Sequence, residues 1–297
     1  MQAIEKFNNR LNNTNSNRFE LWKDYRGKVD QEIKKYLPCS TQGDLLILGA
    51  GNCDDINLVT YISFFKSIVI SDIDISSVNY GIKKQKIDSS KLELIQAEFS
   101  GFERSSFFDQ FISTIHNCKT TSEIKKSIDK LLIPTQKHLF LGDYINRFSV
   151  ILVSPIYTQL VFQQILQMVS VLRIQKYPEE LSNFIEKYML DQMPNIIDNF
   201  NQNILKLLVN NGKVIVLSDI FESNTDSVFF QDIQTNIENL AKVDTLYNNY
   251  VIKYGHGLGD YGIISLNKYL DMLDYKWFIW PFTEKRHMIV KLAVFSN

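Results

Sequence analysis

The sequence is poor in the residues that build disulfide frameworks, zinc sites and flexible linkers. Its 297 residues include three cysteines, twelve glycines and six prolines. Cys39, Cys53 and Cys118 lie far apart and form no CxxC or Cys/His pair, so we expect neither a disulfide framework nor a zinc site. Free thiols in a reducing compartment are the simpler interpretation. With so few glycines and prolines, we also expect no long flexible joint.

The sequence also lacks a charge excess and a long apolar run. Its formal net charge is −1, whereas a protein that binds a phosphate backbone normally carries a basic excess. The polar stretch 1–17 lacks the apolar segment of a signal peptide. The most apolar run, 148–153, is far too short to span a bilayer. We therefore expect a cytoplasmic protein with no membrane partner, and we rank nucleic acid low as a partner.

What the sequence does contain is ordinary globular material. Hydrophobic residues make up 45% of the chain and charged residues 22%, which is enough apolar surface for a sizeable core. The four histidines show no spacing typical of metal ligands, so we predict no metal site; they are His116, His138, His256 and His287.

Short, wholly apolar runs alternate with segments of helical periodicity. The absence of polar alternation within each run is typical of parallel strands that are covered on both faces. Strands that alternate with helices predict βαβ units with right-handed crossovers. The predicted strands are 45–48, 67–71, 92–95, 148–153 and 214–218, with a further short strand near 138–141 and an antiparallel pair at 275–282 and 287–295.

Helical periodicity is clearest in the segment 19–37, where apolar residues recur every three or four positions until Pro38. Residues 1–18 indicate a frayed start or a weak helix. A long helical stretch runs from Pro155 to about Leu208, interrupted by prolines at 178 and 194. It exceeds what one crossover needs, so we expect a lid at about 156–208. Further helices are predicted at 54–65, 76–87, within 104–132, and at 227–241, before a loop with four glycines.

A glycine loop, 49–53 (GAGNC), follows the first predicted strand. Glycine lets backbone approach a ligand closely, because a Cβ would block the approach and because its φ can be positive. In nucleotide-binding sheets the ligand lies outside the carboxyl ends of the strands. The third glycine of the dinucleotide fingerprint is missing, since position 54 is Asp54. Alone the loop is weak evidence, and an ordinary strand-to-helix turn is the alternative.

The next two predicted strands end in acidic residues. The second strand ends at Asp72, with Asp74 two residues later, and Glu98 follows the third strand. An acid at the end of the second strand can hold both hydroxyls of a ribose. A carboxylate at the end of the third strand could accept a hydrogen bond from the exocyclic amine of adenine. The alternative is a solvated strand end or a helix N-cap, for which Asp74 has suitable neighbours.

Taken in order, these segments resemble the motifs of class I S-adenosylmethionine-dependent methyltransferases. The resemblance covers roughly residues 43–295. It implies a Rossmann-like α/β fold with a mostly parallel seven-stranded sheet, an antiparallel last strand, an N-terminal helix and a helical insertion. The matching segments are 46–51 (LILGAG, motif I), 69–74 (VISDID, motif II), 96–99 (QAEF, the third motif) and 207–213 (LLVNNGK, the turn before the fifth strand).

The resemblance divides the chain into an N-terminal helical segment, 1–42, and a methyltransferase domain, 43–297, which includes the lid. It implies S-adenosyl-L-methionine as the cofactor, with backbone at the glycine loop, ribose hydroxyls at Asp72 and the adenine amine at Glu98. The loop continues Asn52-Cys53-Asp54-Asp55 where many members have another glycine. The predicted cofactor-binding residues are Gly49, Ala50, Gly51, Asn52, Asp72, Ile73, Glu98, Phe99 and Ser154.

The methyl acceptor is less clear from the residues. Segment 153–157 (VSPIY) resembles a degenerate Asn/Asp-Pro-Pro-Tyr motif of amino-group methyltransferases, with Ser154 in place of the amide or acid. The alternative is that Ser-Pro merely ends a strand. Tyr157 is one catalytic candidate, and His256, in a glycine-bounded segment, is the other; a surface loop is its alternative.

Substrate candidates lie where the family keeps its substrate contacts. Asp219 ends the fifth predicted strand, Trp280 lies near the end of the sixth, and Tyr25 lies on the N-terminal helix. Trp22 and Arg26 on that helix could also close over the cofactor. For the aromatic residues, packing against the sheet is the alternative.

Three hypotheses follow. The first is a methyltransferase that acts on a small-molecule or peptide-like acceptor. The second is an amino-group methyltransferase that acts on nucleic acid or protein, suggested by segment 154–157. The third is a non-catalytic member that binds the cofactor or a partner without transferring methyl. The acceptor atom, the pathway and the oligomeric state stay open.

Overall fold

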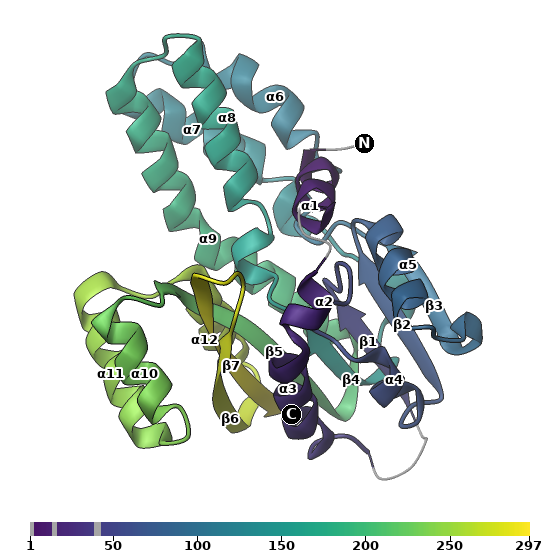
Figure 1. The fold of residues 1–297 in the computed structure, drawn as a ribbon. Helices are drawn as coiled ribbons and strands as arrows, with labels where there is room; N and C mark the ends of the chain where they lie inside the picture. The colour runs from purple at the N-terminus through teal and green to yellow at the C-terminus, as the bar shows by residue number, and fades with distance from the viewer. Residues whose placement is uncertain (1–2, 14–16, 39–42) are drawn as a thin grey trace.

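One sheet organises the molecule in this computed structural model, which describes residues 3–13, 17–38 and 43–297. Within those ranges its seven strands follow the order β3-β2-β1-β4-β5-β7-β6 (Figure 1). Their bounds are β1 Asp44–Leu48, β2 Ser67–Asp72, β3 Leu92–Gln96, β4 Phe148–Val153, β5 Leu208–Asn224, β6 Asp271–Trp280 and β7 Arg286–Ser296. Cys39 lies outside the described residues; Cys53 and Cys118 are buried and unbridged.

The pairing confirms the predicted mixed sheet. Strands β3, β2, β1, β4 and β5 pair in parallel, and β7 is antiparallel to both β5 and β6. The chain order reverses between β1 and β4, which is the switch point where ligands bind in such sheets. The fold therefore has its expected binding crevice at the carboxyl ends of β1 and β4.

Both faces of the sheet are covered, which explains why the strands are apolar throughout. Along β1, Leu45 and Ile47 belong to one buried cluster, whereas Leu46 and Leu48 belong to the other. The first face carries α3 (Lys23–Lys34), α4 (Leu58–Ile62) and α5 (Ile75–Lys84). The second face carries α9 (Glu179–Leu207) and α12 (Leu258–Leu266).

The helical insertion is larger than predicted. Helix α6 (Phe107–Ile115) contacts α7 (Thr121–Leu132) and α8 (Phe162–Ile174), and both α7 and α8 contact α9. Figure 1 shows these four helices standing together beyond the carboxyl edge of the sheet. The predicted lid, about 156–208, is therefore one half of a group whose other half precedes β4. Two distant segments of the chain build it, which a reading along the sequence does not reveal.

Two predicted interruptions are placed differently. Pro178 is the N-cap of α9, and Pro194 lies inside α9 without ending it. The neighbours Met193, Ile196 and Ile197 of Pro194 are all buried, so packing offsets the backbone hydrogen bond that proline lacks. The predicted strand near 138–141 is irregular backbone between short 3-10 turns at Thr135–Lys137 and Gly142–Tyr144, because β4 already fills the place beside β1.

The N-terminal part of the chain is more ordered than predicted. Residues Ala3–Asn13 form α1, and the predicted helix 19–37 is divided at Trp22 into α2 (Arg18–Leu21) and α3. The predicted helix 54–65 is shortened to α4. Figure 1 shows α1 between the α6–α9 group and the strand ends of β1 and β2.

The predicted glycine loop near residue 256 is mostly helix. After α10 (Val228–Asn236) and α11 (Leu240–Tyr254), the chain turns directly into α12. Gly262 lies inside α12, and a Cβ there would be 2.2 Å from the ring of Tyr157. Glycine at this position thus permits close helix packing and does not mark a loop.

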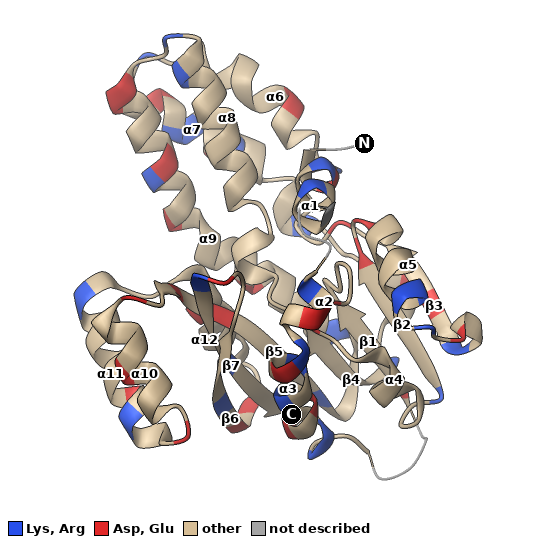
Figure 2. Cartoon of the chain, viewed as in Figure 1, with Lys and Arg blue, Asp and Glu red and all other residues tan. Residues whose placement is uncertain are grey.

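Acidic and basic residues are scattered over the helices in Figure 2, and no large surface of one sign stands out in this view. Among the described helices, no segment is long and apolar enough to cross a membrane.

Candidate functional site

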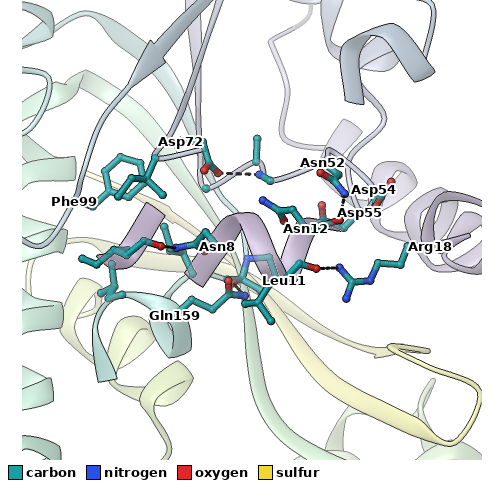
Figure 3. A pocket seen from close by; sticks show the side chains of 18 of the residues that line it. Asn8, Leu11, Asn12, Arg18, Asn52, Asp54, Asp55, Asp72, Phe99 and Gln159 are labelled. Atoms are coloured by element: carbon teal, nitrogen blue, oxygen red, sulfur yellow. Dashed lines mark hydrogen bonds between the residues drawn. The ribbon is translucent and has the colours of Figure 1, made fainter. Parts of the chain in front are cut away.

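A cavity of about 120 Å³ opens at the carboxyl ends of β1, β2, β3 and β4 (Figure 3). It is walled by the glycine loop, three strand ends, helix α1 and an aromatic group. The lining residues are Ile4, Asn8, Leu11, Asn12, Arg18, Trp22, Gly49, Ala50, Gly51, Asn52, Asp54, Asp55, Asp72, Ile73, Glu98, Phe99, Pro155, Ile156, Gln159, Leu160, Trp280 and Phe282.

The glycine loop is held in place by the end of β2. The backbone N–H of Gly51 donates to Asp72 Oδ2 at 2.8 Å, and the N–H of Asp74 donates to Asp72 Oδ1 at 2.8 Å. Gly51 has φ +49°, in the left-handed region that favours glycine. Asp74 caps α5, since its side chain accepts from the N–H of Ser77. The cap alternative is therefore correct for Asp74, and Asp72 is the acid that faces the cavity.

Buried carboxyls make the cavity acidic. Burial raises the pKa of Asp72 to about 6, although the N–H donors of Asp74 and Gly51 oppose the shift. Burial likewise raises the pKa of Asp55 to about 7. Lys84 forms an ion pair with the neighbouring Asp54. A cationic ligand would therefore be favoured beside Asp55 and Asp72, because it would stabilise their charged forms.

Glu98 lines the cavity and has one carboxyl oxygen unpaired within the described structure. Its Oε1 accepts from the N–H of Gly101 at 3.0 Å and from Ser100. Its Oε2 is buried and has no hydrogen-bond partner among the described residues. Since an unpaired buried acceptor is costly, a donor from a ligand suits this position. Phe99 lies beside it, with its ring 5.1 Å from that of Phe140.

An aromatic wall closes the other end of the cavity. The rings of Trp22 and Trp280 meet edge to face at 4.7 Å, and Phe282 stacks on Trp22 at 5.8 Å. The Arg18 guanidinium lies 5.4 Å from the rings of both Trp22 and Phe282. Figure 3 shows Arg18, Asp54 and Asp55 at the end opposite Phe99. One end of the cavity thus has a carboxylate beside an aromatic ring, and the other end has an arginine beside several aromatic rings.

Helix α1 forms a roof over the glycine loop. Asn52 Nδ2 donates to the backbone carbonyl of Asn12 at 2.7 Å, and Asn12 Nδ2 donates to Asp74 Oδ2 at 3.1 Å. Figure 3 shows Asn8, Leu11 and Asn12 of α1 across the middle of the cavity. Small-molecule sites usually enclose about 300–1,000 Å³, so α1 takes up part of the space that such a ligand would need.

The structure gathers most of the predicted cofactor residues around this one cavity. Eight of the nine line it, and Ser154 is the exception; Trp280 of the substrate candidates lines it too. Ser154 is buried directly after β4, and its N–H donates to the carbonyl of Leu48 at 3.0 Å. Tyr25 and Asp219 are buried and do not line the cavity.

The two catalytic candidates do not reach the cavity. Tyr157 is fully buried, and its hydroxyl donates to Asn201 Oδ1 at 2.9 Å, which is the contact of a core residue. His256 is exposed between α11 and α12, where its Nδ1 lies 3.8 Å from Asp260 Oδ2. The predicted glycine-bounded loop would have brought His256 to the pocket, but α12 holds it at the surface.

Reading the sequence missed the α1 face and residues after β4. Ile4, Asn8 and Leu11 recur at steps of four and three, which places them on one helix face. That spacing indicates a helix face, although the polar composition of residues 1–17 obscures the pattern. Gln159 and Leu160 also line the cavity, and no motif marked them. Over the part of the chain that the structure describes, no group of three His, Cys, Asp or Glu could hold a metal.

No protein-family model and no curated protein matches the sequence. Among solved structures, the chain is similar to the N-methyltransferase NodS from Bradyrhizobium japonicum WM9 in complex with S-adenosyl-L-homocysteine, at 13% identity and TM-score 0.45, with 99% of this chain and 98% of that chain covered. It is also similar to a putative sarcosine dimethylglycine methyltransferase from Galdieria sulphuraria, at 12% identity and TM-score 0.43, with 92% and 85% covered. Identities this low give no acceptor for this chain.

The identification of the fold rests on the sheet itself. The parallel strands reverse their order between β1 and β4, and a glycine loop follows β1 at that point. With its antiparallel β7 inserted between β5 and β6, the chain has the Rossmann-like fold of the class I methyltransferases.

Proposed function

We propose that the chain is an S-adenosyl-L-methionine-dependent methyltransferase that acts on a small-molecule or peptide-like acceptor. The observation that carries the proposal is the convergence of the Gly49–Gly51 loop, Asp72 and Glu98, from three adjacent strand ends, on one cavity. A glycine turn, a ribose acid and an adenine-reading acid are the groups that an adenosine ligand requires at such a crevice.

The residues fit the cofactor from end to end. The unpartnered Oε2 of Glu98 would accept from the adenine amine beside the Phe99 ring. Asp72 would accept from the ribose hydroxyls with the lone pairs that Gly51 and Asp74 leave free. The carboxylate of the methionine portion would reach Arg18 at the far end (Figure 3). Asp55 lies on the same side and would favour the cationic groups.

When bound, the cofactor would supply an electrophilic methyl group on a sulfonium. The protein's part is to hold that methyl in line with the acceptor and to exclude water, so positioning does most of the work. Helix α1 already covers the loop, and Trp22, Trp280 and Phe282 close the opposite wall. We infer that α1 moves outward to admit the cofactor and then returns over it.

The nucleic-acid alternative finds less support at the site. Four carboxylates and one arginine line the cavity: Asp54, Asp55, Asp72, Glu98 and Arg18. A polyanion would be repelled by that lining. The non-catalytic alternative predicts cofactor binding without any thioether product in the presence of acceptors.

Calorimetric titration with S-adenosyl-L-homocysteine tests the proposal. We expect binding to the wild type and at least ~30-fold weaker binding to Asp72→Ala, since the variant loses the ribose acceptor and the bond that holds Gly51. Asp88→Asn, which changes an exposed acid that caps a short turn, is the matched control and should bind as the wild type does. Absence of binding to the wild type at millimolar ligand would contradict the proposal.

A further inference from the structure

The turn that follows β3 is built around the side chain of Glu98. Glu98 Oε1 accepts from the backbone N–H of Gly101 at 3.0 Å and from the hydroxyl of Ser100, so this oxygen is used within the turn. Gly101 has φ +80°, in the left-handed region that favours glycine. The other oxygen, Oε2, is buried without a partner in the described structure, and Glu98 lines the cavity. The direction in which Oε2 points therefore depends on what holds the turn 98–101 in place.

His138 holds this turn at both ends, from a segment 40 residues further along the chain. Its Nε2 lies 2.8 Å from the main-chain oxygen of Glu98. Because that oxygen can only accept, Nε2 carries the proton and donates it. At the other end of the turn, a Cβ on Gly101 would lie 2.5 Å from the Cβ of His138, so the two residues are in close contact. One side chain thus fixes both the first and the last residue of the turn.

Helix α9 in turn holds His138. Asn203 Nδ2 donates to the main-chain carbonyl of His138 at 3.0 Å, and to that of Asn199 in its own helix, also at 3.0 Å. Asn203 is only 4% exposed, and a hydrogen bond made away from water is electrostatically stronger than one in water. A chain of printed contacts therefore runs from α9 through His138 to Glu98 at the cavity.

Phe99, the next residue of the turn, is held by the same two segments. Its ring meets that of Phe140 edge to face at 5.1 Å and that of Phe200 at 5.8 Å, and Phe140 stacks on Phe200 at 5.5 Å. All three rings are buried. Phe140 lies two residues after His138, and Phe200 lies on α9 close to Asn203. The hydrogen bonds and the aromatic triad together fix this end of the cavity to α9.

We propose that His138 is a positioning residue for recognition of the adenine base, and that with Asn203 it sets the selectivity of the site for a purine that carries an exocyclic amine. This inference rests on the proposed function, in which Glu98 Oε2 accepts from that amine. A hydrogen bond weakens steeply when its angle or distance departs from the optimum, so a turn that could shift would lose the preference. An oxo group in place of the amine would set one acceptor against another.

Binding of two ligands to variants of His138 tests the inference. S-adenosyl-L-homocysteine carries the amine, and S-inosyl-homocysteine carries an oxo group in its place. The wild type should prefer the first about 10-fold. His138→Leu, which removes the donor and keeps an apolar bulk, should bind S-adenosyl-L-homocysteine about 5-fold more weakly and S-inosyl-homocysteine within about 2-fold of the wild type. His138→Gln, whose amide can donate to the same carbonyl, should restore most of the preference.

Asn203→Leu tests the next contact and keeps the test decisive if His138→Leu does not fold. It removes the donor to His138 together with Asn203 Oδ1, which is buried and has no partner among the described residues. The preference for the amine should fall about 3-fold while the thermal midpoint changes little, because an unpaired buried atom is removed along with the bond. His116→Leu, at an exposed histidine directly after α6, is the matched control and should leave both affinities unchanged.

The outcomes separate this inference from the proposed function. If His138→Leu and Asn203→Leu weaken both ligands equally, or keep the full preference of the wild type, His138 has only a structural role and the inference is overturned. Equal binding of both ligands to the wild type overturns it too, because there is then no selectivity for the base to set. Failure of S-adenosyl-L-homocysteine to bind the wild type would overturn the proposed function, and this inference with it.

Discussion

At the scale of single residues, the site is defined by carboxyls that lie where a carboxyl is expensive to ionise. Asp55, Asp72 and Asp219 all have a raised pKa with burial as the main cause. A fold that keeps such groups without a paired cation sacrifices stability for function. Two of the three, Asp55 and Asp72, line the cavity to which the proposed function assigns the cofactor.

The first prediction concerns Asp55 and pH. The pKa of Asp55 is about 7 in the folded chain, above the ordinary value of 3.8. The carboxyl therefore favours the folded state fully at pH values below 3.8. This contribution shrinks as the pH rises and is lost once the pH passes about 7. Asp55→Asn should thus raise the free energy of unfolding by about 1–3 kcal/mol near pH ~8, and the gain should vanish near pH ~4. Denaturant unfolding of both proteins at the two pH values measures it. An equal gain in the free energy of unfolding at both pH values would contradict the raised pKa of Asp55.

The second prediction concerns Glu98. If its free Oε2 accepts from the adenine amine, then S-inosyl-homocysteine, which lacks that amine, should bind the wild type about 10-fold more weakly than S-adenosyl-L-homocysteine. Glu98→Gln should reduce this difference in affinity between the two ligands, because the amide can offer either a donor or an acceptor. Competition binding of both ligands to both proteins gives the result, and an unchanged ratio would remove Glu98 from the adenine site.

At the scale of elements, the proposed function makes the contact between α1 and the glycine loop the control of access to the cavity. A Cβ at Gly51 would lie 3.2 Å from Asn12 Oδ1, so loop and helix are tightly apposed. Asn12 also bonds Asp74 and, through its carbonyl, Asn52. The helix therefore closes the cavity with a few polar contacts and little apolar burial, as expected of an element that must open.

The third prediction follows from that closure. Asn12→Ala removes the side-chain bond to Asp74, worth about 1 kcal/mol, so S-adenosyl-L-homocysteine should dissociate about 5-fold faster while the sheet keeps its stability. Stopped-flow displacement measures the rate. Asn79→Ala on the exposed face of α5, where Asn79 bonds only Ile75 of its own helix, is the matched control. Equal dissociation rates in wild type and Asn12→Ala would show that α1 does not gate the site.

At the scale of the whole molecule, helix α1 and the α6–α9 group both lie at the carboxyl edge of the sheet (Figure 1). Helix α1 touches α8, so roof and insertion are in contact. A ligand that binds only the folded state adds stability by mass action, about 2.7 kcal/mol at a hundred times its Kd. If the ligand orders α1, the effect should be largest in α1 and in the residues that contact it.

The fourth prediction is therefore about hydrogen exchange. Saturating S-adenosyl-L-homocysteine should slow amide exchange in α1 and in the loop 49–55 by at least ~10-fold, whereas β1 and β4, which are already buried, should change little beyond the global gain. Mass spectrometry of peptides from the free and bound protein measures this. Protection spread evenly over all peptides would show that the ligand adds only global stability.

The sheet and its glycine loop could be predicted from the sequence because both are local. A strand covered on two faces needs an apolar run such as Leu45–Leu48, and a turn at φ +73° and +49° needs glycine at 49 and 51. The acids Asp72 and Glu98 follow, because parallel strands carry their ends to one edge.

What only the tertiary structure decided depends on contacts between distant segments. It placed α1 over the loop, joined α6 and α7 to α8 and α9, and converted the glycine segment near 256 into α12, which leaves His256 at the surface. Local pattern dictates which segments form strands and turns, whereas packing against distant neighbours decides which polar groups are buried and which partners they find.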